Sequence, residues 1–136
     1  MRILAVDLGL VRTGIAVCDK GEVLASPLCT IEEGNPEKVP AKVLEIAVNE
    51  KAEMIVVGFP KNMDGSCGES AKRVERFAQS IRSQTDIPVE LWDERMTTMT
   101  AIGFLNETNV RGKKRKAVID AVSASIILQN FLDSRK

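Results

Sequence analysis

The most constraining feature of the chain is a short apolar run, residues 54–58, that contains no polar side chain. A strand with one face in water alternates apolar and polar residues, so an uninterrupted run predicts a strand covered on both faces. The stretches 35–50 and 69–83 on either side of it carry apolar residues at helical spacing. We therefore expect a central strand in an α/β fold, with helices packed on both faces of the sheet.

Other segments complete this prediction. Strands are predicted at residues 2–7, 14–18, 22–26, 54–58 and 88–92, with Pro27 ending the third. Helices are predicted at residues 35–50, 69–83 and 116–132, with a short one that Thr97 or Thr98 caps and that ends near Leu105. The first three strands are close enough to pair antiparallel, and β-α-β crossovers follow. The sequence predicts one domain, 1–136, with a mixed five-stranded sheet.

Composition narrows the chemistry. The chain has no histidine, which excludes Ser-His-Asp and Cys-His catalysis and histidine-ligated zinc. Its three cysteines fit no zinc spacing and are expected to be reduced thiols, with Cys67 the most exposed. No apolar stretch approaches the roughly 20 residues that span a bilayer. Because Asp7 interrupts the first apolar stretch, we expect no signal peptide and a cytoplasmic location.

Carboxylates follow or lie near the ends of the predicted elements. Asp7 ends the first strand, Asp93 and Glu94 follow the last strand, and Asp120 precedes Ala124 on the apolar face of the final helix. Each also has a simpler explanation, such as a turn cap, a solvated turn or a favourable helix terminus. In such sheets ligands gather at the carboxyl ends of the strands, where the three positions are expected to meet. Clustered carboxylates without histidine favour Mg²⁺ or Mn²⁺, which support phosphodiester cleavage.

Charge and glycine favour a phosphate-rich partner. Residues 1–110 hold 12 basic and 17 acidic residues, a net charge of −5, whereas residues 111–136 hold seven and two, a net charge of +5. Backbone amides in the glycine turns could bind phosphates, and those glycines are Gly9, Gly14 and Gly65. The candidate nucleic-acid-binding side chains are Arg12, Lys61, Arg95, Arg111, Lys113, Lys114, Arg115 and Lys116. The basic run at 111–116 is predicted to be part of a loop that binds a nucleic-acid strand, although such a run can also be a solvated face.

Four motifs, in order along nearly the whole chain, resemble those of the YqgF/RuvX family. They are Asp7-X-Gly9-X-X-Arg12-X-Gly14-X-Ala16, Val57-Gly58-X-Pro60 with Gly65, Asp93-Glu94-Arg95-X-Thr97-Thr98, and a last helix with Lys116, Asp120, Ala121, Ala124, Leu128 and Gln129. The chain departs from the expected pattern at Leu10, Val11 and Ser123, where more polar or smaller residues are expected.

The resemblance implies an RNase H-like fold, akin to the RuvC-type junction resolvases, and a metal-dependent nuclease. It implies that Asp7, Asp120 and a middle carboxylate form the catalytic site and hold Mg²⁺ or Mn²⁺. Glu94 is favoured over Asp93 as that middle ligand, although the sequence leaves both open. The implied substrate is structured RNA, in processing of the 5′ end of pre-16S rRNA during ribosome biogenesis, or alternatively branched DNA, as a Holliday junction resolvase.

Two other classes of protein share some of these features. Actin-like ATPases and sugar kinases also open with a strand, an aspartate and a glycine turn, but they need two such lobes and 136 residues supply one. A non-catalytic nucleic-acid-binding module would explain the basic run with purely structural carboxylates. A resolvase cuts two strands symmetrically and should dimerise, whereas the sequence shows no clear dimer face; we expect a monomer or a weak homodimer.

Overall fold

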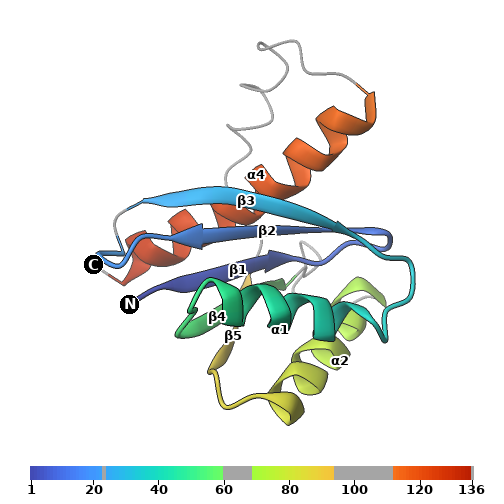
Figure 1. Cartoon of the computed structure of the whole chain (residues 1–136), viewed down its shortest axis with the longest axis horizontal. Helices are drawn as coiled ribbons and strands as arrows, with labels where there is room; N and C mark the ends of the chain where they lie inside the picture. Colours follow the sequence, from blue (N-terminus) through green and yellow to red (C-terminus); the bar gives the residue numbers. More distant parts are fainter. Residues whose placement is uncertain (23, 60–68, 94–111, 136) are drawn as a thin grey trace.

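The computed structural model describes residues 1–22, 24–59, 69–93 and 112–135, without the side chains of residues 69–70 and 112–120 (Figure 1). Its elements are β1 (Ile3–Asp7), β2 (Arg12–Cys18), β3 (Ala25–Glu32), α1 (Val39–Asn49), β4 (Met54–Phe59), α2 (Glu69–Gln84), β5 (Val89–Asp93) and α4 (Gly112–Ser134).

The five strands form a mixed sheet in the order β3-β2-β1-β4-β5. β1 and β2 pair antiparallel, as do β2 and β3, whereas β1, β4 and β5 run parallel. This confirms the predicted sheet, including its antiparallel first three strands. The carboxyl ends of β1, β4 and β5 consequently lie at one edge of the sheet.

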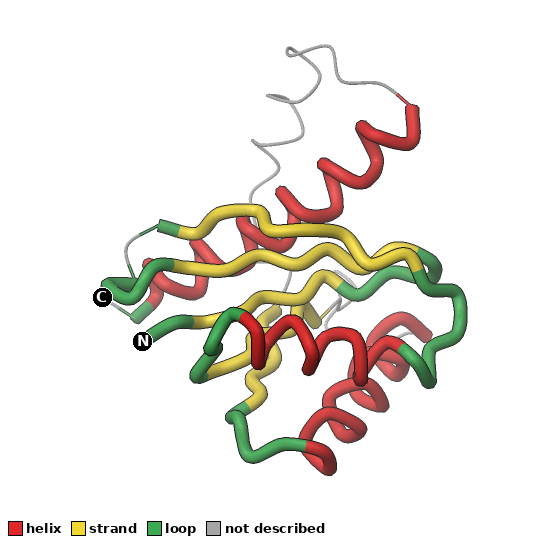
Figure 2. Tube along the Cα trace, viewed as in Figure 1, coloured by secondary structure: helices red, strands yellow, loops and turns green. Residues whose placement is uncertain are grey.

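Helices cover both faces of the sheet, as predicted (Figures 1 and 2). On one side, α1 and α2 bury a large cluster with Leu4, Val6, Ile55 and Val57 of the sheet. We call this side the α1/α2 face. On the other side, α4 packs on a smaller cluster that includes Ile3, Ala5, Met54 and Val56, and we call it the α4 face. Alternate residues of the same buried strands therefore serve two cores, which explains the uninterrupted apolar run at 54–58.

The third strand differs from the prediction. It was expected at residues 22–26 with Pro27 as its end, but β3 begins at Ala25 and continues through Pro27 to Glu32. Proline is tolerated because β3 is an edge strand, where one row of backbone groups has no neighbouring strand to bond. The register shifts between Ile15 and Ala16, opposite this proline.

The first helix also begins later than predicted. α1 starts at Val39 rather than near residue 35, with Pro40 in its first turn. A proline has no N–H and its ring clashes with the carbonyl four residues earlier, so α-helix cannot extend back through residue 36. Asn35 instead closes a turn, since its side-chain Oδ1 accepts a hydrogen bond of 3.0 Å from the backbone N–H of Glu37.

The last helix is longer than predicted. It begins at Gly112, so residues 112–115 are helical and not part of a loop. A long helix that packs on the sheet with its C-terminal half stabilises the turns that precede the packed region. The predicted short helix ending near Leu105 lies outside the described residues.

The C-terminal half of α4 is fixed to the sheet at several points. The side chain of Gln129 accepts a hydrogen bond of 2.9 Å from the backbone N–H of Ala25 on β3. The ring of Phe131 meets that of Trp92 on β5 edge to face, with centroids 5.8 Å apart, and the Arg135 guanidinium lies 5.4 Å from the centre of the Phe131 ring. The N-terminal half of α4 projects away from the sheet in Figure 1. In the part of the chain that the structure describes, no helix is long and apolar enough to cross a membrane.

Candidate functional site

Asp7 is the last residue of β1 and is half-buried. Along β1, Leu4 and Val6 belong to the cluster of the α1/α2 face, whereas Ile3 and Ala5 belong to that of the α4 face. Because side chains alternate along a strand, Asp7 falls on the α4 face. The carboxylate thus lies where the apolar packing of that face ends.

Glycines flank Asp7 on both neighbouring strands. Gly14 of β2 is its registered partner, and Gly58 follows Val57 of β4, which pairs with Val6. Neither glycine has a side chain that could cover the carboxylate from the side, and Asp7 is itself engaged in an interaction. Gly14 was among the predicted site residues and Gly58 was not; its signal was a glycine at the end of an apolar run.

The turn between β1 and β2 depends on Gly9. A Cβ atom at this position would clash with the backbone carbonyl oxygen of Arg12, so the turn cannot form as it stands with any other residue. The backbone N–H of Glu33 donates a hydrogen bond of 2.8 Å to the carbonyl of Val11 and ties the turn to the end of β3. Arg12, the first residue of β2, is half-buried and engaged in an interaction.

The side chains of Asp93 and Asp7 lie on opposite faces of the sheet. Asp93 pairs with Phe59, and Val89 and Leu91 of the same strand pack in the cluster of the α1/α2 face. Alternation therefore puts Asp93 on that face, whereas Trp92 packs on the α4 face. Asp93 is thus badly directed for a site shared with Asp7. Glu94, the alternative middle carboxylate, lies outside the described residues.

Asp120 lies on α4 one helical turn before Ala124. Ala124, Ile127 and Phe131 are buried against the sheet, which confirms the predicted apolar face of this helix. The side chain of Asp120 is beyond the described part of the chain, so its approach to Asp7 stays a prediction from helical spacing.

The other predicted site residues divide into two groups. Lys113, Lys114, Arg115 and Lys116 lie in the first turns of α4 and not on a loop. The remaining ones fall outside the described residues, and they are Lys61, Gly65, Arg95 and Arg111. Within the described ranges, no group of three or more carboxylate or thiol side chains is close enough to hold a metal ion.

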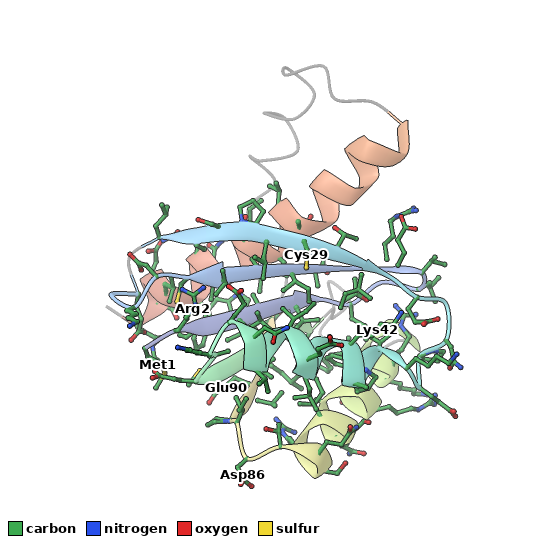
Figure 3. All side chains as sticks on the ribbon, in the orientation of Figure 1. Met1, Arg2, Cys29, Lys42, Asp86 and Glu90 are labelled. Carbon is green, nitrogen blue, oxygen red and sulfur yellow. The ribbon has the colours of Figure 1, made fainter. Side chains whose placement is uncertain are left out.

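The opposite end of the sheet carries a shallow hollow of about 560 Å³ that includes Met1, Arg2 and Glu50 in its lining. Two of its charged side chains pair with each other, since the Arg2 guanidinium donates to the Glu50 carboxylate at 2.6 Å. Figure 3 shows Met1 and Arg2 together at this end. Because strands begin here, the hollow is far from the edge where Asp7 lies, and we assign the candidate site to the Asp7 edge.

Two cysteines are unsuited to nucleophilic chemistry. Burial is the largest cause that raises the pKa of the Cys18 thiol, and it also raises the pKa of Cys29. Both thiols therefore stay protonated at neutral pH, which makes them poor nucleophiles. Cys67, predicted to be the most exposed, lies outside the described residues.

A family model described as "RuvX: Holliday junction resolvase" matches residues 1–134. Among curated proteins, a "Putative pre-16S rRNA nuclease" of Protochlamydia amoebophila is 44% identical, over 98% of this chain and 94% of its own. A protein of the same name from Geobacillus sp. is 43% identical over the whole of both chains.

Solved structures of resolvases share the fold. The RuvC protein of T. thermophilus, solved in complex with a Holliday junction substrate, matches with a TM-score of 0.60 at 16% identity and covers 99% of this chain and 95% of its own. The Holliday junction resolvase of Fowlpox virus matches with a TM-score of 0.58 at 14% identity, over 98% of this chain and 99% of its own. At such low identity these matches concern the fold, and they confirm the predicted RNase H-like architecture.

Proposed function

Since the chain belongs to the RuvX family, we propose that it is a nuclease, a hydrolase that cleaves phosphodiester bonds with the help of a divalent metal ion. The observation that carries this proposal is the position of Asp7. Its carboxylate lies on the α4 face at the carboxyl end of β1, between Gly14 and Gly58. We add Asp120, one helical turn before the buried Ala124, as a second carboxylate of the same site.

The donor set fits Mg²⁺ or Mn²⁺. The chain has no histidine, and carboxylate oxygens are the ligands that these hard cations prefer. We propose that Asp7, Glu94 and Asp120 hold the ion, with Asp93 excluded by its direction. A metal ion bound there would supply an activated water and stabilise the leaving oxygen.

The chain's own residues would position the substrate. The glycines beside Asp7 leave room for a phosphate to reach the carboxylate, and Arg12 follows the same turn with a charge that can neutralise phosphate. Lys113, Lys114, Arg115 and Lys116 give the first turns of α4 a run of positive charge, which suits backbone contacts to a nucleic acid.

For the substrate we favour the 5′ end of pre-16S rRNA, acted on in the cytoplasm by a single-domain enzyme. Two relatives, 44% and 43% identical over 94% and 100% of their own length, carry the name "Putative pre-16S rRNA nuclease". The description of the family favours a second candidate, resolution of Holliday junctions. A resolvase has to cut two strands symmetrically and would need a dimer, so we expect the monomer or weak homodimer to prefer RNA.

The proposal is tested by incubating the purified chain, with Mg²⁺ or Mn²⁺, with a labelled pre-16S 5′ fragment and with a labelled four-way DNA junction. The D7N variant removes the negative charge and keeps the side-chain shape. D86N is the matched control, because Asp86 is an exposed carboxylate in the link between α2 and β5 (Figure 3).

Metal-dependent cleavage of the RNA that D7N loses and D86N keeps would support the rRNA nuclease. Symmetric cuts in the junction with the same dependence on Asp7 would support the resolvase instead. Binding of either substrate without any cleavage would overturn the nuclease and favour a non-catalytic binding module. Equal cleavage by D7N and the unchanged protein would overturn the proposed metal site.

A further inference from the structure

Two large apolar side chains stand in solvent beside the candidate site. Leu10 is 73% exposed and Val11 is 54% exposed, and both lie in the turn between Asp7 and Arg12. Six large hydrophobic side chains are exposed among the described residues, and these are the only two that are consecutive. Single exposed apolar residues are ordinary, whereas two adjacent ones form a small apolar surface that a ligand can cover.

The turn that presents them is held in place. Gly9 permits the tight approach to the Arg12 carbonyl, and the hydrogen bond from the Glu33 N–H fixes the backbone at Val11. The next residue but one, Thr13, is 1% exposed and pairs with Ile31 of β3. Leu10 and Val11 are therefore presented at a defined place near Asp7, instead of folding back onto the protein.

We propose that the Leu10–Val11 pair packs against the face of an unpaired nucleobase of the substrate, next to the phosphate held at Asp7. This proposal rests on the proposed nuclease function and adds a preference for one kind of substrate. Preferred substrates carry an unpaired base beside the bond that is cut, because bases stacked inside a regular duplex present no free face.

Size and surroundings favour a nucleobase over other apolar ligands. Two side chains supply far less area than the roughly 800 Å² per partner that a stable protein interface buries. The aspartate and arginine that border the pair oppose insertion into a membrane. A nucleotide, in contrast, has a base with flat apolar faces of side-chain size and a backbone phosphate whose charge Arg12 can neutralise.

The test measures binding in the D7N background, so that cleavage does not consume the ligand. The ligand is a short RNA hairpin with a single-stranded 5′ extension that carries 2-aminopurine, and the comparison ligand has the same sequence fully paired. The variant is L10S/V11S. The matched control is L24S/V48S, because Leu24 and Val48 are exposed to a similar degree, 61% and 68%, away from the Asp7 edge.

We expect L10S/V11S to bind the hairpin with its extension about five- to tenfold more weakly, since burial of two aliphatic side chains on a base is lost. It should bind the paired ligand as before, and the change in 2-aminopurine emission on binding should disappear. L24S/V48S should match the D7N parent, and the conservative L10M/V11I should retain tight binding.

Equal binding of the extended hairpin by L10S/V11S and its parent would overturn the base contact while leaving the nuclease proposal intact. Equal weakening for both ligands would also overturn it, because that result indicates a general effect on the site. Failure of the protein with Asp7 intact to bind or cleave either nucleic acid would overturn both proposals together. An unchanged thermal transition in L10S/V11S ensures that a loss of binding is not a loss of folding.

Discussion

The two faces of the sheet use the same strands for different purposes. On the α1/α2 face, apolar packing continues past β1 to Leu8 and to Phe59 at the end of β4, and only β5 ends there with a carboxylate, Asp93. On the α4 face, packing on β1 ends at Ala5, and the next position of the same parity is Asp7, flanked by glycines. Strand alternation thus lets one side of β1 continue the core while the other side, one residue away, ends in a carboxylate.

The largest expected effect tests which face carries the middle carboxylate. Alternation directs Asp93 to the α1/α2 face, so E94Q should reduce cleavage roughly a hundredfold or more, since even the outer partners of metal ligands cost about 10- to 100-fold. D93N should retain most activity. The rate of cleavage under single-turnover conditions measures both, and a severe loss in D93N with none in E94Q would reverse the assignment.

A core substitution on the α1/α2 face should change stability instead of chemistry. Ile55 is fully buried between β1 and β5, and I55A should lower the free energy of unfolding by about 2–5 kcal/mol. Urea denaturation measures the loss, and D7N provides the contrast with a much smaller change. If D7N destabilised the protein as much as I55A does, Asp7 would be a structural residue and the contrast between the faces would fail.

The basic start of α4 should affect binding to a smaller degree. Replacing Lys113, Lys114 and Arg115 by glutamine should weaken nucleic-acid binding, and each lost phosphate contact should flatten the dependence of log K on log salt by about 0.7 to 0.9. Titrations at several salt concentrations measure the slope. The matched control replaces the exposed lysines Lys20, Lys38 and Lys51. An equal change of the slope in this control would mean that the phosphate contacts are not specific to α4.

The smallest expected effect lies in the link between β3 and α1. The hydrogen bond from Lys42 is the main cause that lowers the pKa of Glu33 from 4.5, and the two groups are 2.9 Å apart. A carboxyl group whose pKa is lowered in the folded protein stabilises the fold at pH values above its ordinary pKa. This stabilisation is lost as the pH falls through the lowered pKa. E33Q should therefore melt slightly lower than the unchanged protein at pH 7, and this difference should shrink as the pH falls through the lowered pKa, as followed by circular dichroism.

Much of this fold follows from local patterns in the sequence. The apolar run at 54–58 and the helical spacing in 69–83 and 116–132 identified the central strand and two helices, because burial on two faces leaves a clear periodicity. The prediction that Pro27 ends a strand was wrong, since whether proline fits depends on the strand being at an edge. That position in the sheet is set by tertiary pairing and not by neighbouring residues.

The candidate site was partly predictable for a similar reason. The sequence indicates that Asp7 ends a strand, but the choice between Asp93 and Glu94 needed the exact end of β5. A shift of one residue moves a side chain to the opposite face. The position of Gly58 next to Asp7 could not be predicted from the sequence either, because it depends on which strands are neighbours and on their register.

The contact between Trp92 and Phe131 gives the molecule a built-in optical probe. Trp92 is the only tryptophan in the chain, and its ring joins β5, which ends beside the proposed site, to the helix that carries Asp120. Its fluorescence should change if α4 lifts from the sheet or shifts across it. Movement of this helix during a reaction cycle can therefore be followed in the natural protein without an added label.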